Sequence, residues 1–270
     1  MYQKSKDIQN QFEGFLKTPI LWNKKTLHTL KPFEIKQEAT AFNLKIDTNL
    51  RLGKYIERFV SYQLSQNSHT RILSENIQIQ REKITLGELD CILLKNNKPI
   101  HLEVIYKFYL FDATVGNNEI DHFIGPNRKD TLLAKLDKLK NKQLPLLYSS
   151  ECIRYLDTLA LSIDQIVQQV YFKAQLFVPF STKNIQLQQL NSECIFGFYI
   201  SRKEIFQLNS ATFYIPNKKD WLVIPHTNVD WLNYTTFLKQ SQKFLERQFS
   251  PLCWVKNQKG VLEKFFLVWW

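Results

Sequence analysis

Residues 86–110, with the sequence LGELDCILLKNNKPIHLEVIYKFYL, constrain the fold of this chain more than any other stretch. Apolar side chains dominate 86–94 and 99–111, and the residues KNN lie between these two runs. Because asparagine tolerates the backbone angles of tight turns, the pattern predicts two β-strands joined by a short turn. In the second run both alternating faces carry apolar residues, which is typical of a central strand covered on two sides.

Asp90, Glu103 and Lys107 are charged side chains at positions of these strands that we expect to be buried. A buried charge without a partner is costly, so each of the three needs a partner or a chemical role. Carboxylates on neighbouring strands can share a Mg²⁺ or Mn²⁺ ion, which prefers oxygen ligands, and a lysine can stabilise the charge that develops on a phosphate. The pair Asp90 and Glu103 therefore predicts a metal site for phosphodiester chemistry. The alternative is a structural ion pair or capping role for the two acids.

The neighbouring stretches alternate between helical and extended patterns. Residues 49–67 carry an apolar stripe at helical spacing, with Asn49 as the expected N-cap and Glu57 at the edge of the buried face. A solvated Glu57 that pairs with Lys54 or Arg58 is the alternative. Asn127 with Asp130 indicates the start of another helix. The remaining predictions for this part are an amphipathic helix within 1–30, a strand at 76–83, helices at 128–144 and 151–166, and a strand at 167–180.

The C-terminal third has a different composition, and a weak break near residue 181 separates it from the rest. The stretches IFGFYIS, TFYIPN and WLVIPH read as short strands, 231–249 as an amphipathic helix, and the tail as a closing hairpin. This pattern predicts a mixed α+β subdomain over 181–270 that packs on a core formed by residues 1–180.

The order helix, three strands, helix, strand resembles the αβββαβ core of the PD-(D/E)XK (restriction-endonuclease-like) nuclease superfamily. The resemblance depends on Glu57 in the first helix, the run GELD that ends in Asp90, and Glu103 thirteen residues on. It implies an α/β fold with that core over about 45–180, preceded by N-terminal helices and followed by the C-terminal extension. It also implies a Mg²⁺-dependent nuclease in which Asp90 and Glu103 hold the metal and Glu57 assists.

The lysine of that superfamily usually lies two residues after the glutamate, where this chain has Ile105. Lys107 is the nearest lysine on the same face, and its Cα is expected roughly 13 Å from that of Glu103. Lys135, on the next predicted helix, is an alternative because a helix packed across the sheet can direct a side chain to the same pocket. This departure leaves a second interpretation open: a catalytically inactive basic module that binds nucleic acid or a protein.

Four ordered blocks resemble the bacterial domain-of-unknown-function family 1853. They are GELDCILL, HLEVIYKFYL, IGPNRKDTLLAKLDKLKNKQLPL and KAQLFVPF, and the terminal stretches QFEGFLKTPIL and LEKFFLVWW are also similar to that family. The resemblance covers most of the chain and implies a shared fold more than an activity.

The formal net charge of +11 favours a polyanionic partner, above all nucleic acid. The predicted helix at 128–144 has a basic side, on which we expect nucleic acid to bind Lys129, Lys135, Lys138 and Lys142. No secretory h-region, membrane-spanning run, P-loop or HExxH motif is present, so we expect a cytoplasmic protein without a nucleotide cofactor. DNA or RNA, endo- or exonuclease action, and the oligomeric state stay open.

Overall fold

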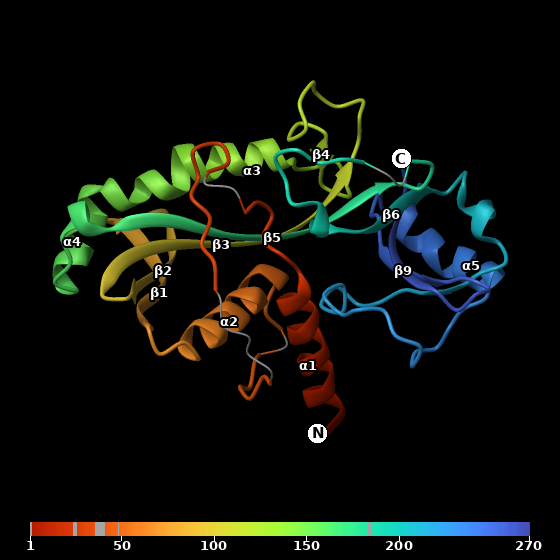
Figure 1. The fold of residues 1–270 in the computed structure, drawn as a ribbon, viewed down its shortest axis with the longest axis horizontal. Helices are drawn as coiled ribbons and strands as arrows, with labels where there is room; N and C mark the ends of the chain where they lie inside the picture. Colours follow the sequence, from red (N-terminus) through yellow and green to blue (C-terminus); the bar gives the residue numbers. More distant parts are fainter. Residues whose placement is uncertain (1, 24–25, 36–40, 48, 183–184) are drawn as a thin grey trace. The chain divides into compact units, whose positions relative to one another are not determined.

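The computed structural model describes residues 2–23, 26–35, 41–47, 49–182 and 185–270. In this part of the chain it is a mixed α/β fold with five α-helices and a large mixed sheet (Figure 1). The chain divides into two compact units. We call residues 20–106 with 134–173 the hairpin unit, and residues 1–19, 107–133 and 174–270 the terminal unit. The boundary near residue 181 that the sequence suggests stays a prediction.

The hairpin unit contains the predicted pair of strands. Strands β1 (Thr70–Arg81), β2 (Ile84–Lys95) and β3 (Lys98–Phe111) form an antiparallel meander, and β5 (Val167–Pro179) is the next strand in the sheet. Asn96 and Asn97 form the turn between β2 and β3 with φ of 51° and 62°, which confirms the predicted turn. The last residues of β3 and β5 belong to the terminal unit.

Helix α2 (Leu52–Ser65) covers one face of these strands, and α3 (Leu132–Lys138) lies over the other face (Figure 1). Tyr55, Ile56 and Phe59 of α2 are almost completely buried, as the apolar stripe predicts. The predicted N-cap at Asn49 is wrong, because Arg51 occupies that position and makes no side-chain cap. The backbone N–H of Asn49 instead donates to the carboxylate of Asp47.

The predicted helix over 128–144 begins later than expected and changes its hydrogen-bond pattern. After α3, residues Leu139–Gln143 form a π-helical turn and Leu144–Tyr148 a 3-10 turn. The capping role of Asn127 and Asp130 is wrong because tertiary contacts occupy both side chains: Asn127 accepts from the backbone of Ser250, and Asp130 accepts from Lys107. Helix α4 (Ser150–Thr158) and a 3-10 turn at Ile163–Gln165 complete this part.

The terminal unit is built on the second half of the strand order, β5-β6-β9-β8-β7. Strand β6 pairs in parallel with β5 and β9, whereas β8 and β9 form the predicted closing hairpin. The strand predicted for WLVIPH is wrong; these apolar residues form a buried turn that includes Trp221 and Leu222. The elements of this unit are α1 (Tyr2–Lys17), β4 (Phe123–Ile124), turns Ser192–Cys194 and Ile205–Leu208, β6 (Ile195–Ser201), β7 (Thr212–Tyr214), α5 (Tyr234–Leu245), β8 (Leu252–Lys256) and β9 (Leu262–Val268).

Rings of phenylalanine form much of the core beneath α5. Phe213 and Phe237 stack with their centroids 4.3 Å apart, and Phe198 and Phe265 stack at 5.4 Å. Among the described residues, no helix is both long and apolar enough to span a bilayer.

Candidate functional site

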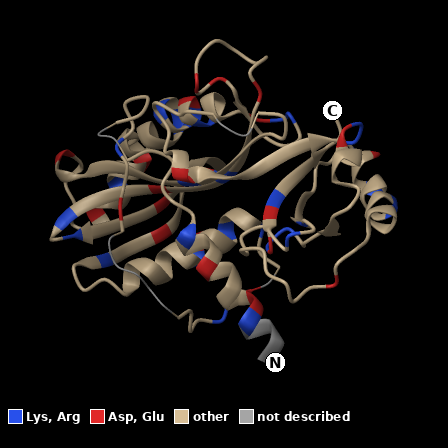
Figure 2. Cartoon of the chain, turned by 45° about the vertical axis from the view of Figure 1, so that its right-hand side comes forward, with Lys and Arg blue, Asp and Glu red and all other residues tan. Residues whose placement is uncertain are grey.

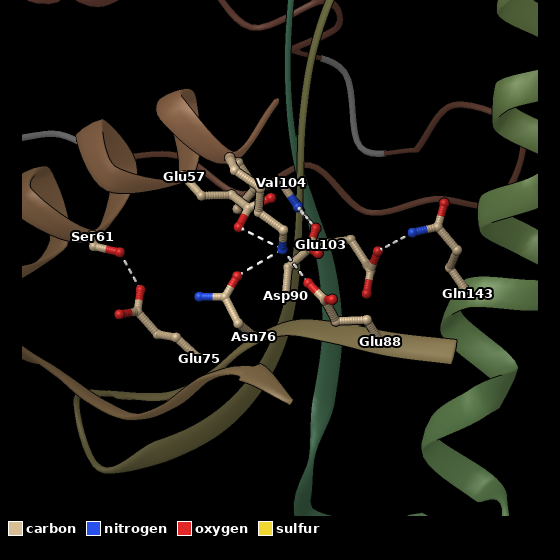
Figure 3. Close-up of polar contacts among 10 residues, drawn as sticks. Glu57, Ser61, Glu75, Asn76, Glu88, Asp90, Glu103, Val104 and Gln143 are labelled. Carbon is tan, nitrogen blue, oxygen red and sulfur yellow. Dashed lines mark hydrogen bonds and ion pairs between the residues drawn. The ribbon is translucent and has the colours of Figure 1, made fainter. Parts of the chain in front are cut away.

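Four carboxylates gather in the hairpin unit. Strand β2 supplies Glu88 and Asp90, β3 supplies Glu103, and α2 supplies Glu57. Figure 3 shows these side chains between α2 and the helical segment that carries Gln143. Glu103 is completely buried and the other three are half-buried. We call these four residues the acid cluster.

Asp90 and Glu103, the predicted metal ligands, lie close enough for the charge of Glu103 to act on Asp90. Burial, the charge of Glu103 and, with a smaller effect, the charge of Glu57 together raise the pKa of Asp90 to about 7. A hydrogen bond of 2.9 Å from the backbone N–H of Val104 to Oδ2 of Asp90 opposes these effects. Because negative charges accumulate at this point, a cation bound between the carboxylates would be favoured.

A histidine fixes the orientation of the Glu103 carboxylate. The amide Nε2 of Gln168 donates both to the Leu144 carbonyl, at 2.7 Å, and to Nδ1 of His101, at 3.0 Å. Since Nδ1 is therefore the acceptor, the ring carries its proton on Nε2, which donates to Oε1 of Glu103 at 3.0 Å. His101 is completely buried, as is Glu103. His101 therefore occupies one oxygen of the Glu103 carboxylate.

The second oxygen of Glu103 connects to a lysine through one amide. Nε2 of Gln143 donates to Oε2 of Glu103, and the ammonium of Lys135 donates to Oε1 of Gln143 at 2.7 Å. The structure thus links Lys135, the alternative lysine, to the predicted metal ligand. No sequence pattern pointed to Gln143, because a glutamine at the end of an amphipathic helix is ordinary.

A different lysine contacts the other acids. The ammonium of Lys54 donates to Oε2 of Glu57 at 2.9 Å, to Oδ1 of Asn76 at 2.7 Å, and to the carboxylate of Glu88. Burial raises the pKa of Glu57, and the contact with Lys54 opposes that shift. Glu57 therefore has the partner that the alternative interpretation suggested, although its side chain is only 16% exposed. Lys54 precedes Glu57 by three residues on one helix, a spacing at which side chains of opposite charge can pair.

The carboxylates fit a magnesium ion better than a softer metal. Among the described residues, no three or more His, Cys, Asp or Glu side chains are grouped to hold a metal ion. Asp90 and Glu103 offer hard oxygen donors, and Mg²⁺ often binds through one or two carboxylates while it keeps several waters. The donor set therefore fits Mg²⁺ or Mn²⁺ held by two side chains.

The model of one protein family matches almost the whole chain. This model, Domain of unknown function (DUF1853), matches residues 4–268. The chain belongs to the DUF1853 family. Neither the curated proteins nor the solved structures contain a match to this chain. Family membership agrees with the resemblance of the four sequence blocks.

The other lysines to which the sequence assigns a role are Lys107, Lys129, Lys138 and Lys142. Lys138 and Lys142 are exposed on α3 and the π-helical turn of the hairpin unit, where Figure 2 shows blue Lys and Arg segments. Lys129 is exposed in the terminal unit. Lys107 also belongs to the terminal unit, and its ammonium donates to Oδ2 of Asp130 at 2.7 Å.

Proposed function

We propose that this DUF1853 chain hydrolyses phosphodiester bonds in nucleic acid with Mg²⁺ or Mn²⁺ held by Asp90 and Glu103. The observation that carries the proposal is the arrangement around buried Glu103. The charge of Glu103 helps to raise the pKa of Asp90. Gln143 donates a hydrogen bond to Glu103 and accepts one from the ammonium of Lys135. Two acids and a nearby cation are the groups that such a hydrolysis requires.

The order of elements supports a PD-(D/E)XK-like core. Apart from the short strand β4 and helix α4, helix α2 is followed by the antiparallel meander β1-β2-β3, by helix α3, and by β5, which neighbours β3. Asp90 lies on the second strand of this series and Glu103 on the third. This is the order that the superfamily resemblance implies, and it brings both carboxylates to neighbouring strands.

The side chains of the cluster suggest a division of roles. A bound metal would polarise the phosphate and lower the pKa of a water molecule. Asp90 and Glu103 would hold the metal, and His101 and Gln143 would keep Glu103 in place. Glu57, whose pKa burial raises, is suited to hold a proton during the reaction.

A lysine would stabilise the negative charge that develops on the phosphate. We favour Lys135 for this role because one amide connects it to Glu103. Lys107, which pairs with exposed Asp130, is the second candidate.

The test is cleavage of single- and double-stranded DNA and RNA by purified protein with Mg²⁺ or Mn²⁺. We expect Asp90→Asn and Glu103→Gln each to lower the rate about 100-fold or more, because each removes a metal ligand. Glu82→Gln is the matched control, since exposed Glu82 lies in the turn before β2 of the same unit. Absence of cleavage with either metal, together with no Asp90-dependent metal binding, would refute the proposal.

A catalytically inactive binding module is the second candidate function. Three observations favour it: residue 105 is isoleucine, both oxygens of Glu103 already accept hydrogen bonds, and Lys54 supplies a cation to the acid cluster. Polynucleotide binding by the wild type that is unchanged in Asp90→Asn, without cleavage, would support this function.

A further inference from the structure

Two lysines and one carboxylate form a charged group in the terminal unit. They are Lys107 in β3, Asp130 in the segment before α3, and Lys218 in the turn after β7. The ammonium of Lys107 donates to Oδ2 of Asp130 at 2.7 Å, and the two side chains are 37% and 46% exposed. We call these three residues the basic group.

Aromatic rings hold Lys218 in place. Its ammonium lies 3.2 Å from the centroid of the Trp221 ring and 5.6 Å from that of the Phe108 ring. Both rings are buried and pack edge to face, with their centroids 5.3 Å apart. Lys218 itself is exposed, so its side chain covers the rings and keeps a surface that a ligand can reach. In the part of the chain that the structure describes, its ammonium forms no ion pair.

The charges of the basic group do not balance. Burial and the charge of Lys107 together lower the pKa of Lys218 to about 7, and the charge of Asp130 opposes this shift. The carboxylate of Asp130 neutralises one ammonium, so one positive charge is left over when both lysines are protonated. An anion bound beside the two lysines would stabilise the charged form of Lys218.

A phosphodiester matches this excess of charge. It carries one negative charge, and its two unesterified oxygens can accept hydrogen bonds from two ammonium groups. A phosphate monoester carries up to about two negative charges at neutral pH, and Asp130 would repel the additional charge. The net charge of +11 of the whole chain also favours a polymer of such groups over a single free anion.

We propose that Lys107 and Lys218 together bind a backbone phosphodiester of a polynucleotide. Trp221 and Phe108 would keep Lys218 in position, and Asp130 would orient Lys107 and disfavour anions of higher charge. Lys107 would then bind the substrate away from the metal. The inference rests on the proposed function for the choice of nucleic acid, but it requires neither the metal nor cleavage.

The experiment is fluorescence anisotropy of the full chain with labelled single- and double-stranded oligonucleotides. EDTA excludes cleavage, and a pH of about 6 keeps Lys218 charged. Lys218→Met retains an apolar stem over the rings and removes the charge. We expect its affinity at low salt to fall about fivefold, and the slope of log affinity against log salt to fall by about one. Lys203→Met, at an exposed position of the same unit, is the matched control and should stay within about twofold of the wild type.

Asp130→Asn tests the balance of charge. Removal of this carboxylate should tighten oligonucleotide binding about threefold, because partly exposed ion pairs contribute modestly. Combined with Lys218→Met, it should restore most of the lost affinity, because one positive charge is again left over. Glu193→Gln, at an exposed position of the same unit, should restore none of it. A Lys218 that only covers the rings would show no such rescue.

Two competitors identify the source of the anion. Inorganic phosphate and polyglutamate, compared at equal concentration of charge, should each displace the oligonucleotide at least about tenfold less well than unlabelled oligonucleotide. Equal competition by phosphate would indicate a free anion as the ligand, and equal competition by polyglutamate an acidic protein; either result overturns the choice of a polynucleotide. Circular dichroism checks that each variant folds. No saturable binding of either oligonucleotide, or equal losses in Lys218→Met and Lys203→Met, would overturn the proposal.

Discussion

The side-chain amide of Gln143 donates a hydrogen bond to the carboxylate of Glu103, from a π-helical turn to a strand that lies forty residues earlier. The other end of the same amide accepts from Lys135. A glutamine can do both because its amide carries a donor and an acceptor. Gln143 therefore orients the Glu103 carboxylate and connects it to the ammonium of Lys135, although the hydrogen bond of Lys135 is to the amide and not to the carboxylate.

Gln143→Met keeps the length of this side chain and removes both hydrogen bonds. Partners that orient a metal ligand usually change metal affinity by 10- to 100-fold, so we expect Mn²⁺ binding to weaken by about tenfold. Calorimetry measures the affinity, and the exposed substitution Gln80→Met in the same unit is the control. If both variants bind Mn²⁺ like the wild type, Gln143 has only a packing role.

Lys54→Met should strengthen metal binding. Removal of the ammonium leaves Glu57 and Glu88 without their cation, which raises the attraction of the cluster for a metal. We expect Mn²⁺ to bind about two- to fivefold more tightly, because partly exposed ion pairs contribute modestly. An affinity that falls would contradict this account of Lys54.

Charge reversal of the basic segment tests nucleic-acid binding. In Lys138→Glu with Lys142→Glu, two exposed cations of the hairpin unit become anions. If both contact phosphates, the slope of log affinity against log salt should fall by about two, and binding at low salt should weaken by at least about tenfold. Fluorescence anisotropy with labelled oligonucleotides measures both quantities. Lys239→Glu with Lys243→Glu, on α5, is the control, and an equal loss there would show only a general charge effect.

Stability should depend on pH through Lys264. This side chain is completely buried, and its ammonium donates to Oε1 of Gln175 and to the carbonyl of Trp221. Burial lowers its pKa from 10.5 to about 7. Between these values the unfolded chain binds a proton that the folded chain lacks, so the free energy of unfolding rises with pH, and it falls again as pH drops towards 7.

Lys264→Met provides the comparison. Between about pH 7.5 and 8.5, the wild type should gain about 1 kcal/mol of stability per pH unit relative to the variant. Urea unfolding at each pH measures the difference and cancels the titration of groups that both proteins share. A difference that does not change with pH would mean that the oxygen acceptors keep Lys264 charged.

Several predictions from sequence agree with the structure because local pattern decided them. The two-residue turn at Asn96 and Asn97, the apolar stripe of α2 and the closing hairpin each depend on residues close in the chain. The errors occur where distant residues intervene. Asn127 and Asp130 do not cap a helix because Ser250 and Lys107 engage them.

The sequence by itself determined that Asp90 and Glu103 lie on neighbouring strands, since alternation and a short turn leave little freedom for a hairpin. Only the tertiary structure decided which groups surround them. His101 and Gln168 fix Glu103, Gln143 connects it to Lys135, and Lys54 contacts Glu57 and Glu88. The physical reason is that a hydrogen bond needs atoms about 3 Å apart in a defined direction, which the packing of separate helices against the sheet sets and no local pattern encodes.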